Sequence, residues 1–292
     1  MRASLSELEL ARLEAPGAPD AQLVIRLAQR TLDELAMQPP VSHEIIASMR
    51  DIAEIAEGDI PWAGCLVPGP AGLRMTLRRR DPAGKKRFTA FHEVKHTYMP
   101  GFTSVAQYRC DPATPPDETP KRDVGIETLC DLGAAELLFP RATFKADIAG
   151  NGATVRLVED LADRYDASLE ATARRLVSLR AEPTMLLILE PACKPSQPDA
   201  EPALRVQSVK SNDRQRLYLP KHKSVSDDSP FGRALGGESV DEITSLQNVA
   251  THKTTRVRIS AGQYPYTGSR GERHMRVLAL ITAVGSGSGH GR

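Results

Sequence analysis

Two histidines and a glutamate stand in the spacing HExxH, as His92, Glu93 and His96. A helix turns about 100° per residue, so both imidazoles would lie on one face, one turn apart, where they can reach a single metal ion. Glu93 would flank that face and could reach a water molecule bound to the metal. The spacing therefore predicts a zinc site with a carboxylate base beside it; the alternative is an ordinary helix with two surface histidines.

A catalytic zinc ion takes three protein ligands and keeps one position open, so a third donor is required. Glu127 and Asp131 lie one turn apart in an otherwise apolar segment. Because a buried charge is costly unless it is compensated, we expect Glu127 to bind Zn2+ and Asp131 to accept the free ring N–H of a histidine ligand. Mn2+ is an alternative ion, and two exposed carboxylates are the alternative structure. Four carboxylates of the preceding loop are rival ligands: Asp111, Asp117, Glu118 and Asp123.

Apolar residues at helical spacing predict four helices in the first half of the chain, at about 20–36, 42–57, 85–98 and 124–138. The third would carry the HExxH residues, and the fourth would carry the two carboxylates. Order before residue 20 is not expected, because proline and glycine interrupt a short apolar pattern there.

Two short strands are predicted at about 65–67 and 73–77, on either side of a Pro-Gly turn. The second strand could bind an extended substrate by strand addition. A neutral donor that holds an oxyanion is also common in such sites, and the sequence selects none of the candidates Tyr98, Tyr108 and His274.

The second half begins with two predicted helices, at about 154–165 and 168–180, that have the look of a helix-turn-helix. The second helix offers Arg174, Arg175 and Arg180, whereas the first carries three carboxylates. A recognition helix should present basic or amide groups to DNA, so we expect this pair to pack against the core of the preceding domain instead.

A β-rich region follows, with strands predicted at about 184–189, 204–209, 256–259 and 275–282. Apolar and polar residues alternate in the later strands, which is typical of a sheet that is packed on one face and solvated on the other. Residues 201–292 hold 14 Lys or Arg against 8 Asp or Glu, a mild asymmetry that suits a separate domain.

The composition is that of a globular protein with more than one domain. Of 292 residues, 40% are hydrophobic, and the net charge of +1 gives no sign of a general polyanion partner. Four cysteines without a CxxC pair, and an N-terminus without a signal-peptide pattern, predict reduced thiols in the cytoplasm. No apolar stretch approaches about 18 residues, so no membrane span is expected.

The HExxH pattern, the segment Glu127-Thr-Leu-Cys-Asp131 some thirty residues later and the Ala-Glu-Leu-Leu-Phe-Pro run after it together resemble the ImmA/IrrE family of metallopeptidases. The resemblance covers about residues 40–145 well and the rest more loosely. It implies that His92, His96 and Glu127 bind the metal and that Glu93 is the catalytic carboxylate.

The resemblance also implies an α+β fold in three parts and a tail. A zincin-like helical peptidase domain with a small antiparallel sheet would span 20–145, and a helix-turn-helix-like connector would span 146–182. A β-rich, GAF-like sensor or docking domain would span 183–284, before a flexible tail at 285–292.

The function that the resemblance implies is site-specific proteolysis, typically of an XRE-type repressor, to switch on a stress or mobile-element response. The alternative is a DNA-binding or ligand-sensing regulator with a non-catalytic metal site. Lys95 departs from the family pattern, in which many members have glycine. We expect its long cationic side chain to crowd or charge the cleft.

Overall fold

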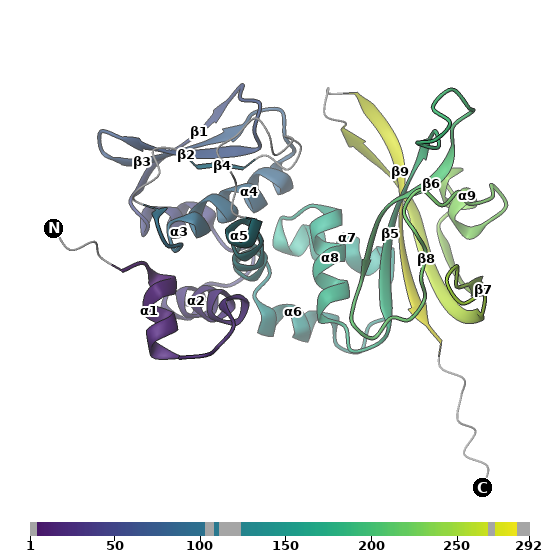
Figure 1. Ribbon diagram of the computed structural model, residues 1–292, viewed down its shortest axis with the longest axis horizontal. Coiled ribbons are helices and arrows are strands. Elements are labelled where there is room, and N and C mark those ends of the chain that lie inside the picture. Colours follow the sequence, from purple (N-terminus) through teal and green to yellow (C-terminus); the bar gives the residue numbers. More distant parts are fainter. Residues whose placement is uncertain (1–4, 103–107, 111–123, 268–271, 285–292) are drawn as a thin grey trace, which may run out of the picture. The chain divides into compact units, whose positions relative to one another are not determined.

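The computed structural model describes residues 5–102, 108–110, 124–267 and 272–284, and only the backbone of 108–110. It divides the chain into an N-terminal unit, residues 1–144 with 163–168, and a C-terminal unit, residues 145–162 with 169–292 (Figure 1). The rival ligands Asp111, Asp117, Glu118 and Asp123 and the predicted tail at 285–292 lie outside the described residues. None of the described helices is long and apolar enough to cross a membrane.

Five helices build most of the N-terminal unit: α1 (Glu7–Glu14), α2 (Asp20–Glu34), α3 (His43–Ser48), α4 (Ala83–His96) and α5 (Val124–Leu138). The bounds of α2, α4 and α5 lie within two residues of the predicted ones. Helix α1 lies where no order is expected, and a capping box starts it: the Ser6 hydroxyl accepts from the Glu9 backbone N–H while the Glu9 carboxylate accepts from the Ser6 backbone N–H.

The helix predicted at 42–57 is wrong in its second half. Helix α3 ends at Ser48, and strand β1 (Ile52–Gly58) follows after Asp51, whose φ of +56° takes the backbone out of the helical region. The apolar residues Ile52 and Ile55 fit a helical and a strand pattern equally, so periodicity alone does not separate the two. Pairing with a strand more distant in sequence decides the outcome.

Four strands form the sheet of this unit, in the order β1-β3-β2-β4. Strands β2 (Gly64–Gly69) and β3 (Gly72–Arg78) form an antiparallel hairpin, β4 (Tyr108–Cys110) pairs antiparallel with β2, and β1 pairs parallel with β3. The sheet is therefore mixed, and the prediction of an antiparallel sheet is wrong for the pairing of β1 with β3. Strand addition at 73–77 is also wrong, because β3 is already hydrogen-bonded to a strand on each side.

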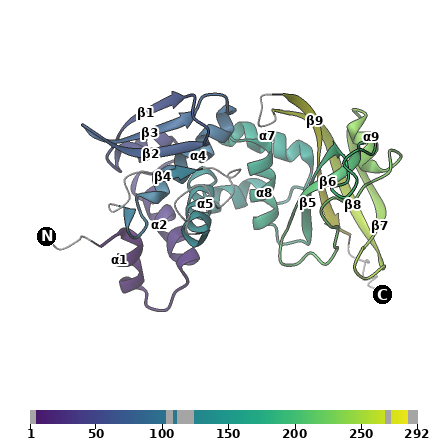
Figure 2. The same ribbon diagram turned by 45° about the horizontal axis from the view of Figure 1, so that its top comes forward.

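Helix α4 runs between this sheet and the other helices, as Figures 1 and 2 show. It packs on β2, β3 and β4 with one side and on α5 with another, and α5 packs in turn on α2. Phe91 and Val94 of α4 and Cys130, Ala134 and Leu137 of α5 are fully buried. Two packed helices and a sheet thus fix the orientation of the HExxH residues.

The C-terminal unit is built on a five-stranded antiparallel sheet in the order β6-β5-β9-β8-β7. Its strands are β5 (Thr184–Ala192), β6 (Ala203–Ser211), β7 (Val240–Gln247), β8 (Thr254–Thr267) and β9 (Arg273–Ala283). The helices of this half are α6 (Arg141–Ile148), α7 (Val155–Tyr165), α8 (Leu169–Leu179) and α9 (Pro230–Leu235). The sequence indicates all of these except α6, α9 and β7.

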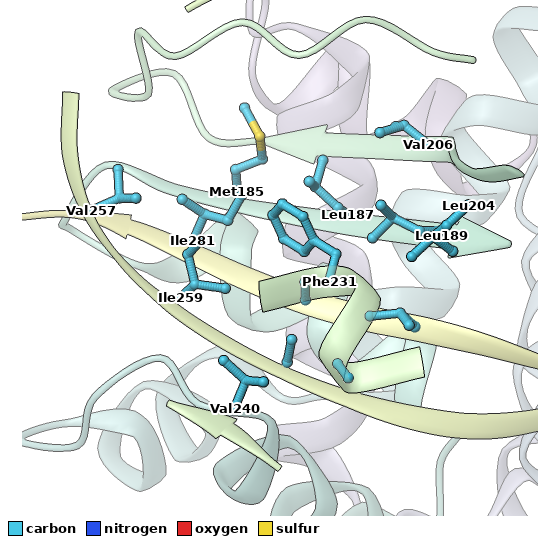
Figure 3. Close-up of a cluster of buried hydrophobic side chains, with 14 of the residues drawn as sticks. Met185, Leu187, Leu189, Leu204, Val206, Phe231, Val240, Val257, Ile259 and Ile281 are labelled. Carbon is cyan, nitrogen blue, oxygen red and sulfur yellow. The ribbon is translucent and has the colours of Figure 1, made fainter. Parts of the chain in front are cut away.

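Both faces of this sheet are covered. Figure 3 shows one face, where Leu187, Ile259 and Ile281 surround Phe231 of the short helix α9. Alternate residues of the same strands, such as Leu186 and Leu280, are buried on the opposite face, where α8 packs on β5 and β6. The predicted solvated face is therefore wrong for the central strands, and a GAF-like identity of this unit stays a prediction.

Helix α8 uses its basic residues inside its own unit. Arg174 is hydrogen-bonded to the Glu170 carboxylate and the Ser208 hydroxyl, Arg175 is 8% exposed, and the Arg180 side chain is 8% exposed. A recognition helix needs such groups free for phosphates and base edges. The geometry therefore does not favour α8 as a DNA-reading helix. Helix α8 packs on the sheet of its own unit, a partner that the sequence does not indicate.

Candidate metal centre

Helices α4 and α5 bring the two histidines and Glu127 together. The Nε2 atoms of His92 and His96 lie 3.1 Å apart. A Glu127 carboxylate oxygen lies 3.2 Å from His92 Nε2, and the other lies 3.8 Å from His96 Nε2. Both histidines are almost fully buried, and the Glu127 side chain is 23% exposed.

This donor set fits a zinc ion. Ligand atoms about 2.0–2.1 Å from a tetrahedral zinc lie about 3.3 Å from one another, close to the separations of the three donors. Two imidazoles and one carboxylate are also the donors of catalytic zinc sites that keep one position open. Without a cation between them, two facing nitrogens and a carboxylate would have to be held together by shared protons.

The outer ring nitrogens have separate partners. His92 Nδ1 lies 2.8 Å from Asp131 Oδ1, so an Nδ1–H donated to this carboxylate leaves the Nε2 lone pair available to a metal ion held together with Glu127. His96 Nδ1 lies 3.6 Å from Cys130 Sγ. The sequence gives no special weight to Cys130 beyond a small buried side chain, although it lies on the same helix face as Glu127, three residues later.

Cys130 is also a rival metal ligand, since its sulfur gathers with the two histidines within 4.8 Å. One observation favours Glu127 instead. The sulfur lies at Nδ1 of His96, whereas the other histidine and the carboxylate lie at Nε2.

Glu93 is fully buried and lies against strand β2. Its carboxylate and the methyl of Thr89, one turn earlier on α4, both lie against Gly64 where a Cβ atom would be. The helix and the sheet thus hold Glu93 next to the two histidines, as the HExxH spacing predicts.

Lys95 does not crowd or charge the cleft, contrary to expectation. It is 0% exposed, its stem lies against Gly133 of α5, and its ammonium lies 3.6 Å from the centre of the Tyr98 ring. Among the described residues, its Nζ has no hydrogen-bond partner. Burial lowers the pKa of Lys95 to about 7.

Replacing Lys95 by methionine is expected to stabilise the metal-free protein below about pH 7, because an unsatisfied buried polar group costs of order 1–3 kcal/mol or more. The pKa of Lys95 is about 7 when folded and about 10.4 when unfolded. Between these values the unfolded chain binds more protons, so wild-type stability rises with pH. The gain in Tm from Lys95→Met should therefore shrink from pH 7 to pH 10, and a gain that is constant with pH would contradict this account.

Of the three candidate oxyanion donors, Tyr98 has a hydroxyl that is already engaged elsewhere in the N-terminal unit. Tyr98 is 2% exposed, and its hydroxyl lies 3.1 Å from the Thr31 hydroxyl. His274 belongs to the C-terminal unit, where it lies 3.4 Å from a Glu272 carboxylate oxygen. The side chain of Tyr108 lies outside the described residues.

The fold and the donor geometry are those expected of an HExxH metallopeptidase domain, and comparison with known proteins supports a metallopeptidase at the level of the family. Residues 66–177 match the IrrE N-terminal-like domain. The radiation response metalloprotease IrrE of Deinococcus deserti is 27% identical over 153 residues, which are 52% of this chain and 53% of that protein. IrrE of Deinococcus radiodurans is 23% identical over 193 residues, which are 63% of this chain and 57% of that protein.

These matches support an ImmA/IrrE-family protein, and the family match itself covers residues 66–177. It spans only about half the length of the curated relatives that it matches. A solved structure of a Mycobacterium tuberculosis transcriptional regulator matches over 89% of this chain and 76% of that chain, with a TM-score of 0.58 and 12% sequence identity. That likeness concerns the fold alone.

Proposed function

We propose that the chain is a zinc-dependent, site-specific endopeptidase in which His92, His96 and Glu127 bind the metal and Glu93 is the general base. The observation that carries this proposal is the convergence of two Nε2 atoms and a carboxylate from helices α4 and α5. A structural zinc site has no need of a carboxylate base beside its ligands, so the intact Glu93 supports catalysis.

A bound zinc ion would supply Lewis acidity, which makes its water more acidic and polarises the peptide carbonyl. The residues of the chain supply the rest. Glu93 accepts the proton of the attacking water and passes it to the leaving amine. Asp131 accepts the Nδ1–H of His92, which keeps the tautomer whose Nε2 faces the metal.

Asp131→Ala is expected to weaken zinc binding about 10–100-fold without abolishing it, because it removes a partner of a ligand and not a ligand. Competition with a chromogenic chelator measures the affinity. Thr128→Ala is the matched control, since Thr128 is an exposed residue of α5 whose hydroxyl donates to the helix carbonyl of Val124. Equal affinity of Asp131→Ala and this control would contradict the role of Asp131.

The family resemblance extends the proposal to an XRE-type repressor as the substrate, cleaved in the cytoplasm to derepress a stress or mobile-element response. The test incubates the zinc-loaded chain with the XRE repressor encoded nearest to its gene and maps the cut by mass spectrometry. A single cut that needs both zinc and Glu93 would support the proposal. An intact repressor together with salt-dependent operator binding by this chain would favour the alternative, a DNA-binding regulator.

The same resemblance gives the C-terminal unit a sensor or docking role. The unit offers a pocket of about 360 Å³ lined by Glu159, Glu238, Gln263 and Tyr264. The full chain has to be used in any test, because a cut near residue 183 would remove the sheet on which α8 packs. Cleavage rates with and without the small-molecule fraction of the host cell test the sensor role, and identical rates would count against it.

A further inference from the structure

Gly64 of strand β2 lies at the closest approach between the sheet and the HExxH helix. A Cβ atom at this position would lie 2.9 Å from Glu93 Oε1 and 3.2 Å from Glu93 Cγ. It would also lie 2.6 Å from the Thr89 Cγ2 methyl. Real Cβ atoms essentially never show contacts under 3.0 Å, so any side chain here would force its neighbours to move.

The backbone of Gly64 does not itself call for glycine. Its φ lies outside the positive range that disfavours other residues, and glycine in a strand weakens the strand. A strand glycine often marks a place where another group approaches closely. Here the approaching groups are the Thr89 methyl and the Glu93 side chain.

Strand β2 cannot readily yield to relieve this crowding. Gly64 pairs with Leu77 of β3 on one side and with Cys110 of β4 on the other. Helix α4 is likewise held from behind by α5, where a Cβ at Gly133 would lie 2.3 Å from Lys95 Cε. With both backbones held, a side chain at position 64 would displace the Glu93 carboxylate.

We propose that Gly64 is a positioning residue for Glu93: the missing side chain at position 64 leaves the space that the carboxylate occupies beside the two histidines. This inference rests on the proposed function for its catalytic meaning, though not for its geometry. A misplacement of about 1 Å in a catalytic group can cost about 100-fold in rate. We therefore expect Gly64→Ala to lower kcat by about this factor and to leave KM unchanged.

The first experiment separates Glu93 from Thr89 and needs no substrate. Every variant carries Thr89→Ser, which removes the Cγ2 methyl. A double-mutant cycle then compares the Tm of proteins with and without Gly64→Ala, each with glutamate or alanine at position 93. Gly64→Ala should lower Tm while Glu93 is present and should cost much less once Glu93 is alanine. Equal costs in both backgrounds, or failure of Gly64→Ala to fold in both, would overturn the proposal, whereas folding only with Glu93→Ala would support it.

The second experiment reads the site itself. Cobalt(II) alone is the probe of the ligands. Its visible spectrum should be the same with glycine or alanine at position 64, because the atoms nearest to that position belong to Thr89 and Glu93 and not to the proposed ligands. A fluorescence-quenched peptide that spans the cut mapped in the repressor gives kcat and KM. Gly58→Ala is the matched control, a strand glycine of the same sheet whose Cβ would lie 2.9 Å from the Thr76 methyl and away from Glu93.

Lowered kcat with an unchanged cobalt spectrum supports the inference. A changed spectrum, or a kcat equal to that of Gly58→Ala, overturns it. If the wild type cleaves nothing, the proposed peptidase function fails, while the double-mutant cycle still decides whether Gly64 makes room for Glu93.

Discussion

Glu93→Gln protein will bind zinc as tightly as the wild type and will not cleave its substrate. Glutamine has the shape of glutamate but cannot accept the proton of the attacking water, and a positioned general base contributes about 10²–10⁴-fold to rate. Glu93 is fully buried, and glutamine fills the same volume. The substitution therefore removes the base without leaving a cavity. Zinc content, zinc affinity and single-turnover cleavage of the mapped substrate are the measurements.

Glu54→Gln is the matched control for this change. Glu54 pairs with Arg74 on the surface, with both side chains more than half exposed, so its loss should alter neither activity nor stability appreciably. Cleavage by Glu93→Gln at a rate near that of this control would refute the assignment of the base. Loss of zinc from Glu93→Gln would instead mean that Glu93 is a ligand.

The parts of the site that the sequence predicts are those that depend on local geometry. His92 and His96 share a face because any helix places residues four apart on one side, and Glu127 and Asp131 share a face for the same reason. Apolar periodicity also predicts α4 and α5 to within two residues. A spacing along the chain is enough for all of these.

The parts that the sequence does not predict depend on contacts between distant segments. Strand β1 becomes a strand because β3 pairs with it, and Lys95 turns away from the cleft because Gly133 leaves a slot for its stem. The contact between Cys130 and His96 and the contact between Gly64 and Glu93 each join different elements. Gly64 lies just before the strand predicted at 65–67, so the sequence gives no local signal of this approach.

The choice of Glu127 as the third ligand joins both kinds of inference. Its spacing to Asp131 comes from the helix, but its distance to the histidines comes from the packing of α5 on α4. Among the described residues, Cys130 is the competing donor, and its position at Nδ1 of His96 separates it from the Nε2 atoms. Ligand substitutions can therefore distinguish the two residues directly.

Glu127→Ala is expected to lose zinc more completely than Asp131→Ala, and to lose cleavage together with the zinc. Asp131→Ala removes only the partner of a ligand, which lowers zinc affinity about 10–100-fold. Removing Glu127 leaves two protein ligands where catalytic zinc takes three. Cys130→Ala is the matched control on the same helix and should keep its zinc, because the thiol lies at the outer nitrogen of His96 and not at Nε2. If Glu127→Ala retains zinc and Cys130→Ala loses it, Cys130 and not Glu127 is the third ligand. A metal-bound crystal structure with Asp111 or Asp123 at about 2 Å from the ion would instead assign the third ligand to a loop carboxylate.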